Sequence, residues 1–352
     1  MSVDSASDTF FALLTFLLIL SPALLHVLAY AGERSRALRV ATVVLLGAFD
    51  VFAAMVGALL AISPAVLDLA TMPPPSPDAS PASTEALVAA IGSLGTVLLV
   101  AALAGLLLLV PAARRILARV VPIDPSRLVH AVALHDALLL VIVSAAIALV
   151  IPVVLADPEG LDMLSDNMAS GGLAVLWIQN AAFALLAVFG VGWLVARDGR
   201  AVIARLGLDQ PLSIRWWFGG VAVALGASLL LDAIWGAIAP EQMADVERLS
   251  EALIEPILAF GWAGAFTIGA AAGIGEELLF RGAAQPRFGL LLTSLLFAVL
   301  HTQYSVSPAL ILIFVLALIL GVARQRAGTW TAIAVHATYN FVIAAMALLG
   351  GT

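Results

Sequence analysis

The 352-residue sequence contains no cysteine and no lysine, and few of its residues are charged. The absence of cysteine excludes disulfides, thiolate metal sites and cysteine catalysis. Charged residues make up 11% of the chain, whereas soluble domains carry about 25%. All 16 basic residues are arginine and form no basic patch outside short connections, so we expect no nucleic-acid partner. An all-arginine, Ala/Val/Leu-rich chain is typical of high-GC coding, which favours a bacterial origin.

Apolar residues account for 63% of the chain, and its mean hydropathy is +1.12. A helix needs roughly 20 apolar residues to cross a bilayer. Runs of this kind predict an all-α polytopic membrane protein with about ten transmembrane segments. They span residues 9–30, 38–63, 86–111, 128–155, 172–196, 216–239, 257–285, 290–303, 308–323 and 330–349. The eighth and ninth are short for full crossings and are expected to be tilted or partly re-entrant.

The connections between these segments alternate between arginine-bearing and acidic ones. Arginines gather at 34–39, 112–127 and 197–215, whereas acidic residues gather at 156–170 and 241–255. The positive-inside rule makes the arginine-bearing connections cytoplasmic. Ten crossings then place both termini outside a bacterial inner membrane, with the Pro/Ser-rich stretch 72–84 as an outer loop.

The polar residues divide the chain into two parts. Residues 1–213 carry few ionisable groups within their spans and predict an N-terminal transmembrane region of open role. Residues 214–352 carry a polar constellation and predict the catalytic helix bundle. Asp50 and Asp232 also lie inside spans, and their role stays open.

The constellation lies on three apolar segments of the second part. Glu276 precedes the expected inner turn at Pro286 by ten residues, which places it about 15 Å deep at about 1.5 Å per residue. The same rise places His301 at about 18 Å, and His336 and Asn340 at about 10 and 16 Å. A carboxylate, two imidazoles and an amide therefore reach one level, and ionisable groups at membrane depth are candidates for function.

Spacing along the helices separates two adjacent carboxylates. Glu277 and Arg281 are four residues apart and can form an ion pair on one helix face. Glu276 points about 100° away from Glu277 and is left to face another surface. The spacing Gly269-x-x-x-Gly273 permits a neighbouring helix to approach these carboxylates closely.

Three motifs in this part resemble one family. The sequence EELLFR (276–281) matches EExxxR, FAVLH (297–301) matches FxxxH, and HATYN (336–340) matches HxxxN. In this order they resemble the CPBP family of CAAX prenyl proteases and bacteriocin-processing (Abi) proteins, which are intramembrane glutamate endopeptidases. The resemblance covers residues 257–345.

The resemblance implies a role for each motif residue. Glu276 and His301 are expected to activate the water that attacks a peptide carbonyl, and His336 with Asn340 to stabilise the oxyanion. The supporting residues are Glu277, Arg281 and Phe297. The expected partners are membrane lipid and a peptide or membrane-protein substrate, and no cofactor is expected.

Alternatives to this hypothesis belong to other classes of protein. A non-catalytic membrane scaffold on the same fold would not need every motif residue. A proton-coupled transporter using Glu276, Asp50 and Asp232 would favour paired half-repeats with broken helices, which the sequence does not show. A zinc hydrolase with Glu276, His301 and His336 as ligands is a variant of the protease hypothesis, and no HExxH motif accompanies it.

Overall fold

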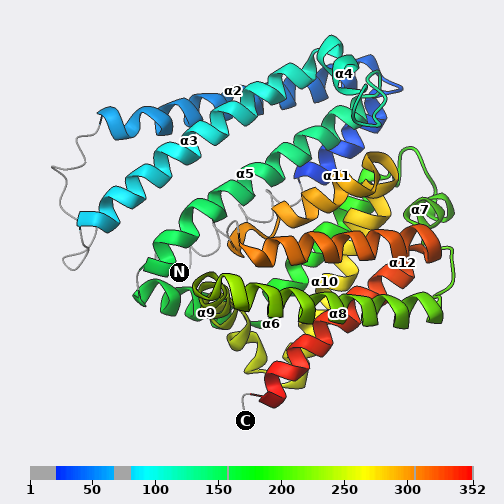
Figure 1. Cartoon of the computed structure of the whole chain (residues 1–352). Helices are drawn as coiled ribbons and strands as arrows, with labels where there is room; N and C mark the ends of the chain where they lie inside the picture. Colours follow the sequence, from blue (N-terminus) through cyan, green and yellow to red (C-terminus); the bar gives the residue numbers. More distant parts are fainter. Residues whose placement is uncertain (1–20, 67–80, 157, 305–306, 351–352) are drawn as a thin grey trace, which may run out of the picture.

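The computed structural model describes residues 21–66, 81–156, 158–304 and 307–350. Over these residues the chain is built from helices and short helical turns, as Figure 1 shows, and the expected all-α fold is confirmed. The N-terminal part comprises helical residues 21–32, α2 (Arg36–Val66), α3 (Pro81–Leu109), α4 (Pro111–Leu117), α5 (Leu128–Ala156), α6 (Pro158–Gly190) and α7 (Gly199–Leu206). The C-terminal part comprises α8 (Ile214–Ile238), α9 (Pro240–Leu258), α10 (Trp262–Glu277), the π-helical turn η2 (Leu278–Ala284), α11 (Gln285–Val299), the 3₁₀ turn η3 (Thr302–Tyr304) and α12 (Pro308–Gly350).

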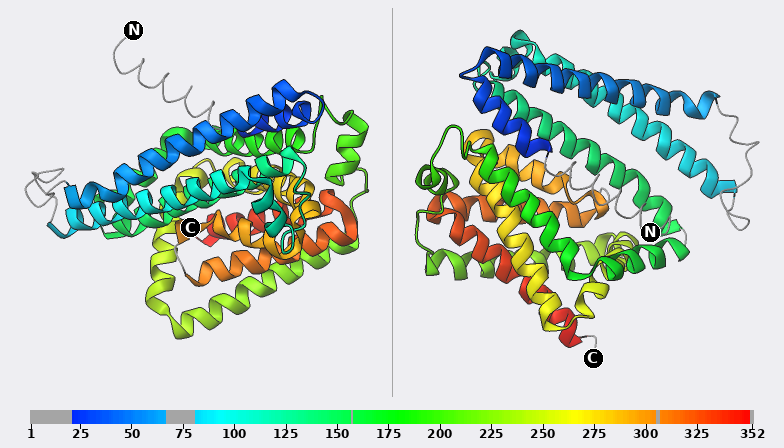
Figure 2. Two further views of the ribbon diagram at one scale, coloured as in Figure 1. Left: turned by 90° about the horizontal axis from the view of Figure 1, so that it is seen from above. Right: turned by 180° about the vertical axis from the view of Figure 1, so that it is seen from behind.

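Most of the N-terminal helices lie beside the C-terminal bundle, and α6 enters it. Helices α2 and α3 run side by side as a long hairpin, and α5 lies between this hairpin and the rest of the molecule in both views that show it (Figures 1 and 2). Helix α6 reaches into the C-terminal bundle and packs against α10. The boundary expected at residue 213, between an N-terminal region and a C-terminal module, stays a prediction. Helix α6 lies before this boundary and yet packs against the helix that carries Glu276 and Glu277.

Seven helical stretches of the described chain are long and apolar enough to cross a membrane, so the expected count of ten is not confirmed. Each of the last two contains two of the expected segments. Residues Trp262–Val299 (38 residues) and Ala309–Gly350 (42 residues) would extend about 57 and 63 Å as straight helices, twice the roughly 30 Å of a bilayer core. Most of the first expected segment, and residues 72–80 of the expected outer loop, lie outside the described residues.

Two glycines bend these long stretches where the sequence placed its connections. Gly289 (φ 81°, ψ 170°) and Gly328 (φ 83°, ψ 169°) adopt backbone angles that side chains with a Cβ rarely reach. The limb from 290 to 299 is about 15 Å long at the helical rise, which is too short to cross the bilayer core. If the eighth expected segment enters the membrane only partly and the ninth returns to the same side, the chain ends on the side that two full crossings would also reach. The expected orientation of the termini is therefore the same in both cases.

Two acidic connections are helical where the sequence predicted loops. Helix α6 begins at Pro158 and contains one non-helical residue, Gly172 (φ 55°, ψ −156°), where the apolar segment was expected to start. Helix α9 (Pro240–Leu258) is amphipathic: Leu249 and Ile257 are buried, and its acidic residues face outward. Such a helix forms because its apolar face packs on the bundle, which a search for fully apolar runs cannot detect.

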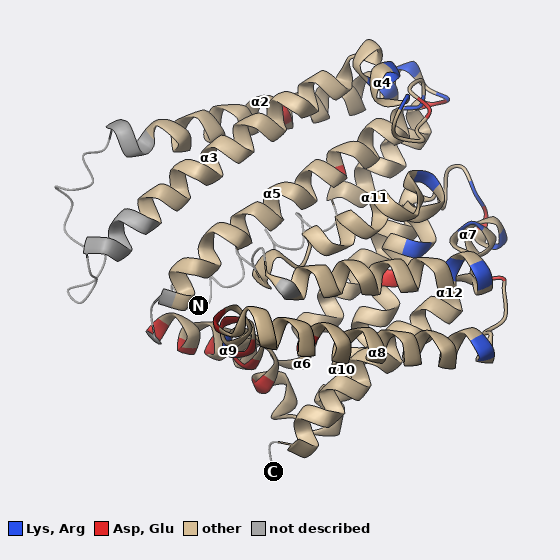
Figure 3. Ribbon diagram, in the orientation of Figure 1, with Lys and Arg blue, Asp and Glu red and all other residues tan. Residues whose placement is uncertain are grey.

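Charge is distributed unequally between the two ends of the bundle. Figure 3 shows the arginines of α4, α7 and the bend of α12 at one end, and the acidic residues of α9 and of the start of α6 at the other. This segregation is what the positive-inside rule produces in a multi-pass membrane protein. Which end faces the cytoplasm remains a prediction.

Candidate active site

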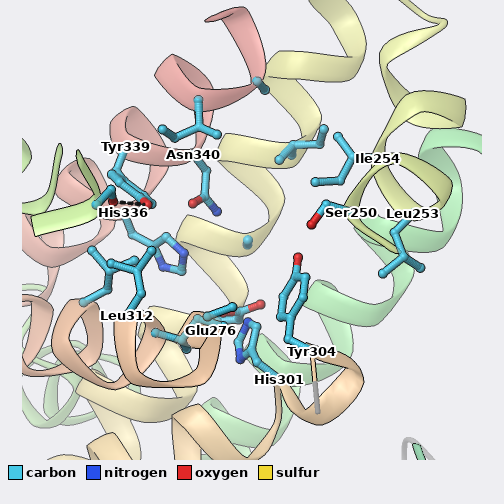
Figure 4. A pocket seen from close by; sticks show the side chains of 18 of the residues that line it. Ser250, Leu253, Ile254, Glu276, His301, Tyr304, Leu312, His336, Tyr339 and Asn340 are labelled. Carbon is cyan, nitrogen blue, oxygen red and sulfur yellow. Dashed lines mark hydrogen bonds between the residues drawn. The ribbon is translucent and has the colours of Figure 1, made fainter. Parts of the chain in front are cut away.

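The residues of the constellation surround one cavity in the C-terminal bundle. Glu276, His301, His336 and Asn340 all line this cavity, whose volume is about 590 Å³. Figure 4 shows Glu276 and His301 next to each other, with His336 and Asn340 on the adjoining helix. The structure therefore brings together the four residues for which catalytic roles were predicted from the sequence, whereas it leaves Asp50 outside the cavity lining.

Close packing between α10 and α12 holds the two motif helices together. A Cβ at Gly273 would lie 2.8 Å from the Cβ of Ala337, and one at Gly269 would lie 2.5 Å from the carbonyl oxygen of Ala337. Ala337 directly follows His336 in the sequence. The expectation that this glycine pair admits a neighbouring helix is met, because any larger residue would push His336 away from the carboxylates.

Glu277 is the most buried member of the site and has two partners. Its side chain is 0% exposed, and its Oε2 lies 3.2 Å from Nε of Arg281, which is 1% exposed. Its Oε1 accepts a hydrogen bond of 2.9 Å from Nδ1 of His336. The ion pair with Arg281 was predicted from the spacing, but the bond to His336 was not, since spacing within a helix does not show which way a second helix is turned.

Arg281 is buried and contacts three different groups. Its Nη2 donates to the carbonyl of Ala317 at 3.2 Å, and its guanidinium carbon lies 4.4 Å from the centre of the Phe297 ring. A desolvated cation over an aromatic ring is stabilised by about 2 kcal/mol. With the Glu277 carboxylate as its counter-ion, the arginine fixes the start of η2, a π-helical turn of the kind often found at functional sites.

Phe297 packs against both histidines of the site. Its ring centre lies 4.9 Å from that of His301 and 6.0 Å from that of His336, and the Phe280 ring meets it edge-on at 5.2 Å. The ring of Phe297 is 3% exposed. This residue therefore orients both imidazoles, which gives the aromatic position of FxxxH a physical reason.

Hydrogen bonds to the Nδ1 atoms leave both imidazole Nε2 atoms available. His301 Nδ1 donates to the carbonyl oxygen of Phe297 at 2.9 Å, because a carbonyl can only accept. His336 Nδ1 donates to the Glu277 carboxylate. A neutral His301 therefore offers Nε2 as a proton acceptor, and a protonated His336 offers Nε2–H as a donor, with the negative charge of Glu277 beside it.

Glu276 differs from its neighbour in having an uncommitted carboxylate. Its Oε2 atom is buried and has neither a hydrogen-bond nor an ion-pair partner among the described residues, whereas Oε2 of Glu277, also without a hydrogen bond, lies 3.2 Å from Nε of Arg281. An atom without either partner is costly to bury unless something in the cavity bonds to it. The adjacent glutamates thus have different surroundings: Glu277 is bound to Arg281 and His336, and Glu276 faces the cavity.

Two tyrosines in the cavity were missed by the sequence analysis. Tyr304 and Tyr339 both line it, and Figure 4 shows the Tyr304 hydroxyl directed toward Ser250 of α9. Burial raises the pKa of Tyr304, and its hydrogen bond to Ser250 acts in the opposite direction. The chain has only three tyrosines, and two of them lie in this cavity. Their scarcity in the sequence could have drawn attention to these two positions.

The metal alternative needs three convergent ligands. Within the described parts of the chain, no group of three His, Cys, Asp or Glu side chains is arranged to hold a metal ion. Asp50, considered for an ion path, instead accepts a 3.1 Å hydrogen bond from His135 among the N-terminal helices. Asp232 does line the cavity, on α8.

The part of the chain that contains this site matches the model of a known family. Residues 258–342 match the family model described as Type II CAAX prenyl endopeptidase Rce1-like, so the resemblance expected from the three motifs is confirmed for this part of the chain. The matched segment contains every motif residue from Glu276 to Asn340. A comparison with curated proteins and a comparison with solved structures find no match. At the level of the family, the module is that of a membrane endopeptidase.

Proposed function

We propose that this protein hydrolyses a peptide bond of a membrane-associated protein or peptide by a metal-independent glutamate mechanism. The observation that carries the proposal is the contrast between the two adjacent carboxylates. Glu277 is fully buried with Arg281 and His336 as partners, whereas Glu276 lines the cavity beside His301 and forms no ion pair or hydrogen bond with a described residue. A scaffold would have no need of a carboxylate left without a partner at the wall of this cavity.

The attack begins with a water bound between Glu276 and His301. A proton of this water passes to the Glu276 carboxylate or to Nε2 of His301, and the water oxygen forms a bond to the scissile carbonyl carbon. General-base catalysis of this kind contributes about 10²–10⁴-fold. The carbonyl π electrons move onto oxygen and give a tetrahedral oxyanion.

The oxyanion is stabilised by donors on α12. Nε2–H of a protonated His336 and the side-chain amide of Asn340 lie one helical turn apart and line the same cavity. When the carbon–nitrogen bond breaks, the leaving amine takes the proton held by Glu276 or His301. The carboxyl product forms, and the site returns to its starting protonation state.

The test compares membranes that contain wild-type protein with membranes that contain Glu276→Gln. We expect new peptide N-termini in the wild-type membrane proteome and none that depend on the protein in the variant. Glu251→Gln, the same chemical change on the exposed face of α9, should behave as wild type. If Glu276→Gln is folded, membrane-inserted and as proteolytic as wild type, the assignment of the base is wrong.

A further inference from the structure

The cavity extends beyond the motif residues along one face of α8. Ser228, Asp232 and Trp235 line it, at spacings of four and three residues that place them on one side of the helix. The Ser228 hydroxyl is 2.7 Å from the hydroxyl of Tyr339, the residue before Asn340. This face of α8 is therefore part of the same cavity wall as the proposed oxyanion site.

The charges that border the cavity have one sign. Its described lining residues include the carboxylates Asp232 and Glu276 and no arginine, and the chain has no lysine. Helix α9 covers the cavity with an apolar face, and none of its five acidic residues lines the cavity. Such a cavity attracts cations and repels anions.

Asp232 lacks a counter-ion within the part of the chain that the structure describes. No described residue forms an ion pair or hydrogen bond with its carboxylate, although it lies inside the candidate span Ile214–Ile238. Asp232 is exposed rather than buried, so its carboxylate is accessible to a charged group that enters the cavity. Trp235, one turn away, has an indole Nε1 that is buried and also without a partner.

A carboxylate beside an aromatic ring is an arrangement that binds ammonium or guanidinium groups. The carboxylate supplies charge and hydrogen-bond acceptors, and the ring face attracts the cation. The remaining lining side chains are mostly aliphatic, among them Leu231, Leu312 and Ile343. These surroundings fit an apolar substrate segment that carries a single positive group.

We propose that Asp232 and Trp235 form a subsite for one cationic group of the substrate, a Lys or Arg side chain within an otherwise apolar segment. The inference rests on the proposed function and deepens it, because it gives the substrate class of the same cavity. The subsite selects where the segment is cleaved, since the cation bound at α8 fixes which peptide bond lies between Glu276 and the donors on α12.

The test uses an internally quenched apolar peptide of about 20 residues, acetylated at its N-terminus, in lipid nanodiscs. One Lys is moved stepwise through the sequence, and Met replaces it in the matched peptide of similar length and shape. At one Lys position we expect kcat/KM to exceed that of the Met peptide by about 10–100-fold, the range of a hydrogen bond to a charged group. Asp232→Asn should remove this preference, Asp232→Glu should retain part of it, and Glu251→Gln should leave it unchanged.

Two further arms separate the possible outcomes. A Met peptide with a free N-terminus tests a terminal amine as the cation: cleavage that prefers it over every Lys peptide would overturn the assignment to a side chain. Binding of the labelled Lys and Met peptides to the Glu276→Gln protein, with and without Asp232→Asn, tests the subsite without turnover. If wild type cleaves neither peptide but Lys binding still depends on Asp232, the proposed function fails and the subsite stands. If Lys and Met peptides bind equally, the subsite is refuted.

Discussion

Removal of the buried carboxylate Glu277 should destabilise the protein more than any surface charge change. In Glu277→Gln the guanidinium of Arg281, 1% exposed, keeps its charge and loses a counter-ion 3.2 Å away. An uncompensated buried charge costs about 3–5 kcal/mol. At about 2 °C per kcal/mol for a large domain, the unfolding midpoint should fall by roughly 6–10 °C. The measurement is thermal unfolding of purified protein in detergent, followed by tryptophan fluorescence.

Two companion variants make this prediction refutable. In Glu277→Gln/Arg281→Met both charges are absent, so the double variant should be more stable than Glu277→Gln alone. Asp245→Asn breaks a surface pair with Arg248, whose side chains are 51% and 53% exposed, and should cost less than about 1 kcal/mol. Two results would refute the reasoning. The double variant could lose as much stability as Glu277→Gln and Arg281→Met together, or Asp245→Asn could lose as much as Glu277→Gln. Either result would show that the buried ion pair does not stabilise the protein.

The same carboxylate should affect turnover through His336. Glu277→Gln removes the charged acceptor of the 2.9 Å hydrogen bond from Nδ1 of His336, whereas Arg281→Met leaves that bond in place. Loss of one oxyanion donor lowers kcat by about 10²–10³-fold. We therefore expect Glu277→Gln to reduce kcat well below Arg281→Met at a similar loss of stability. Equal effects on kcat would show that Glu277 acts on the fold alone.

The remaining predictions concern the oxyanion donor Asn340, the need for a metal, the orientation of the protein in the membrane and the hydrogen bonds of Arg205 to η2. Asn340→Ala should slow turnover by about 10²–10³-fold without a change in unfolding midpoint. Activity should persist in EDTA and phenanthroline; loss with chelator and recovery with zinc would contradict the glutamate mechanism. Cysteines placed singly at 156–170 should react with an impermeant maleimide in intact cells and those at 112–127 or 197–210 should not; the reverse pattern would invert the topology. Arg205→Met should lower stability by about 2–3 kcal/mol, with partial rescue by Lys, because Arg205 donates to two carbonyls at the end of η2 at 2.9 and 3.1 Å; an unchanged midpoint would contradict this.

Distances along a helix could be predicted from the sequence, and rotations between helices could not. The rise per residue placed Glu276, His301, His336 and Asn340 at one depth, and all four line one cavity. The ion pair of Glu277 followed from four-residue spacing in the same way. The contact of Glu277 with His336 depends on how α10 and α12 are turned about their axes, and that is decided by the Gly273 contact with Ala337.

Amphipathic helices and polar cavity walls were the other features that the sequence analysis missed. Helix α9 was expected to be a loop because its charges interrupt every apolar run, yet its apolar face closes the cavity through Val246, Leu253 and Ile254. Asp232 was noted as an isolated carboxylate in a span. Its place beside the motif residues depends on the packing of α8 against α12, and no local pattern records that packing.

The adjacent glutamates can serve different functions because consecutive residues of a helix point about 100° apart. One of them faces α12 and Arg281, where its charge is matched, and the other faces the cavity, where it is not. An unmatched carboxylate in an apolar bundle is costly, and distortion of its helix toward solvent would relieve that cost. The matched ion pair one residue later opposes this distortion, since any rotation of α10 that moved Glu276 away from the cavity would also separate Glu277 from His336. The contacts of Glu277 with Arg281 and His336 thus hold Glu276 in a position that is itself destabilising. Because Glu276→Gln removes the unmatched charge and keeps these contacts, it should raise the unfolding midpoint or leave it unchanged while it removes activity.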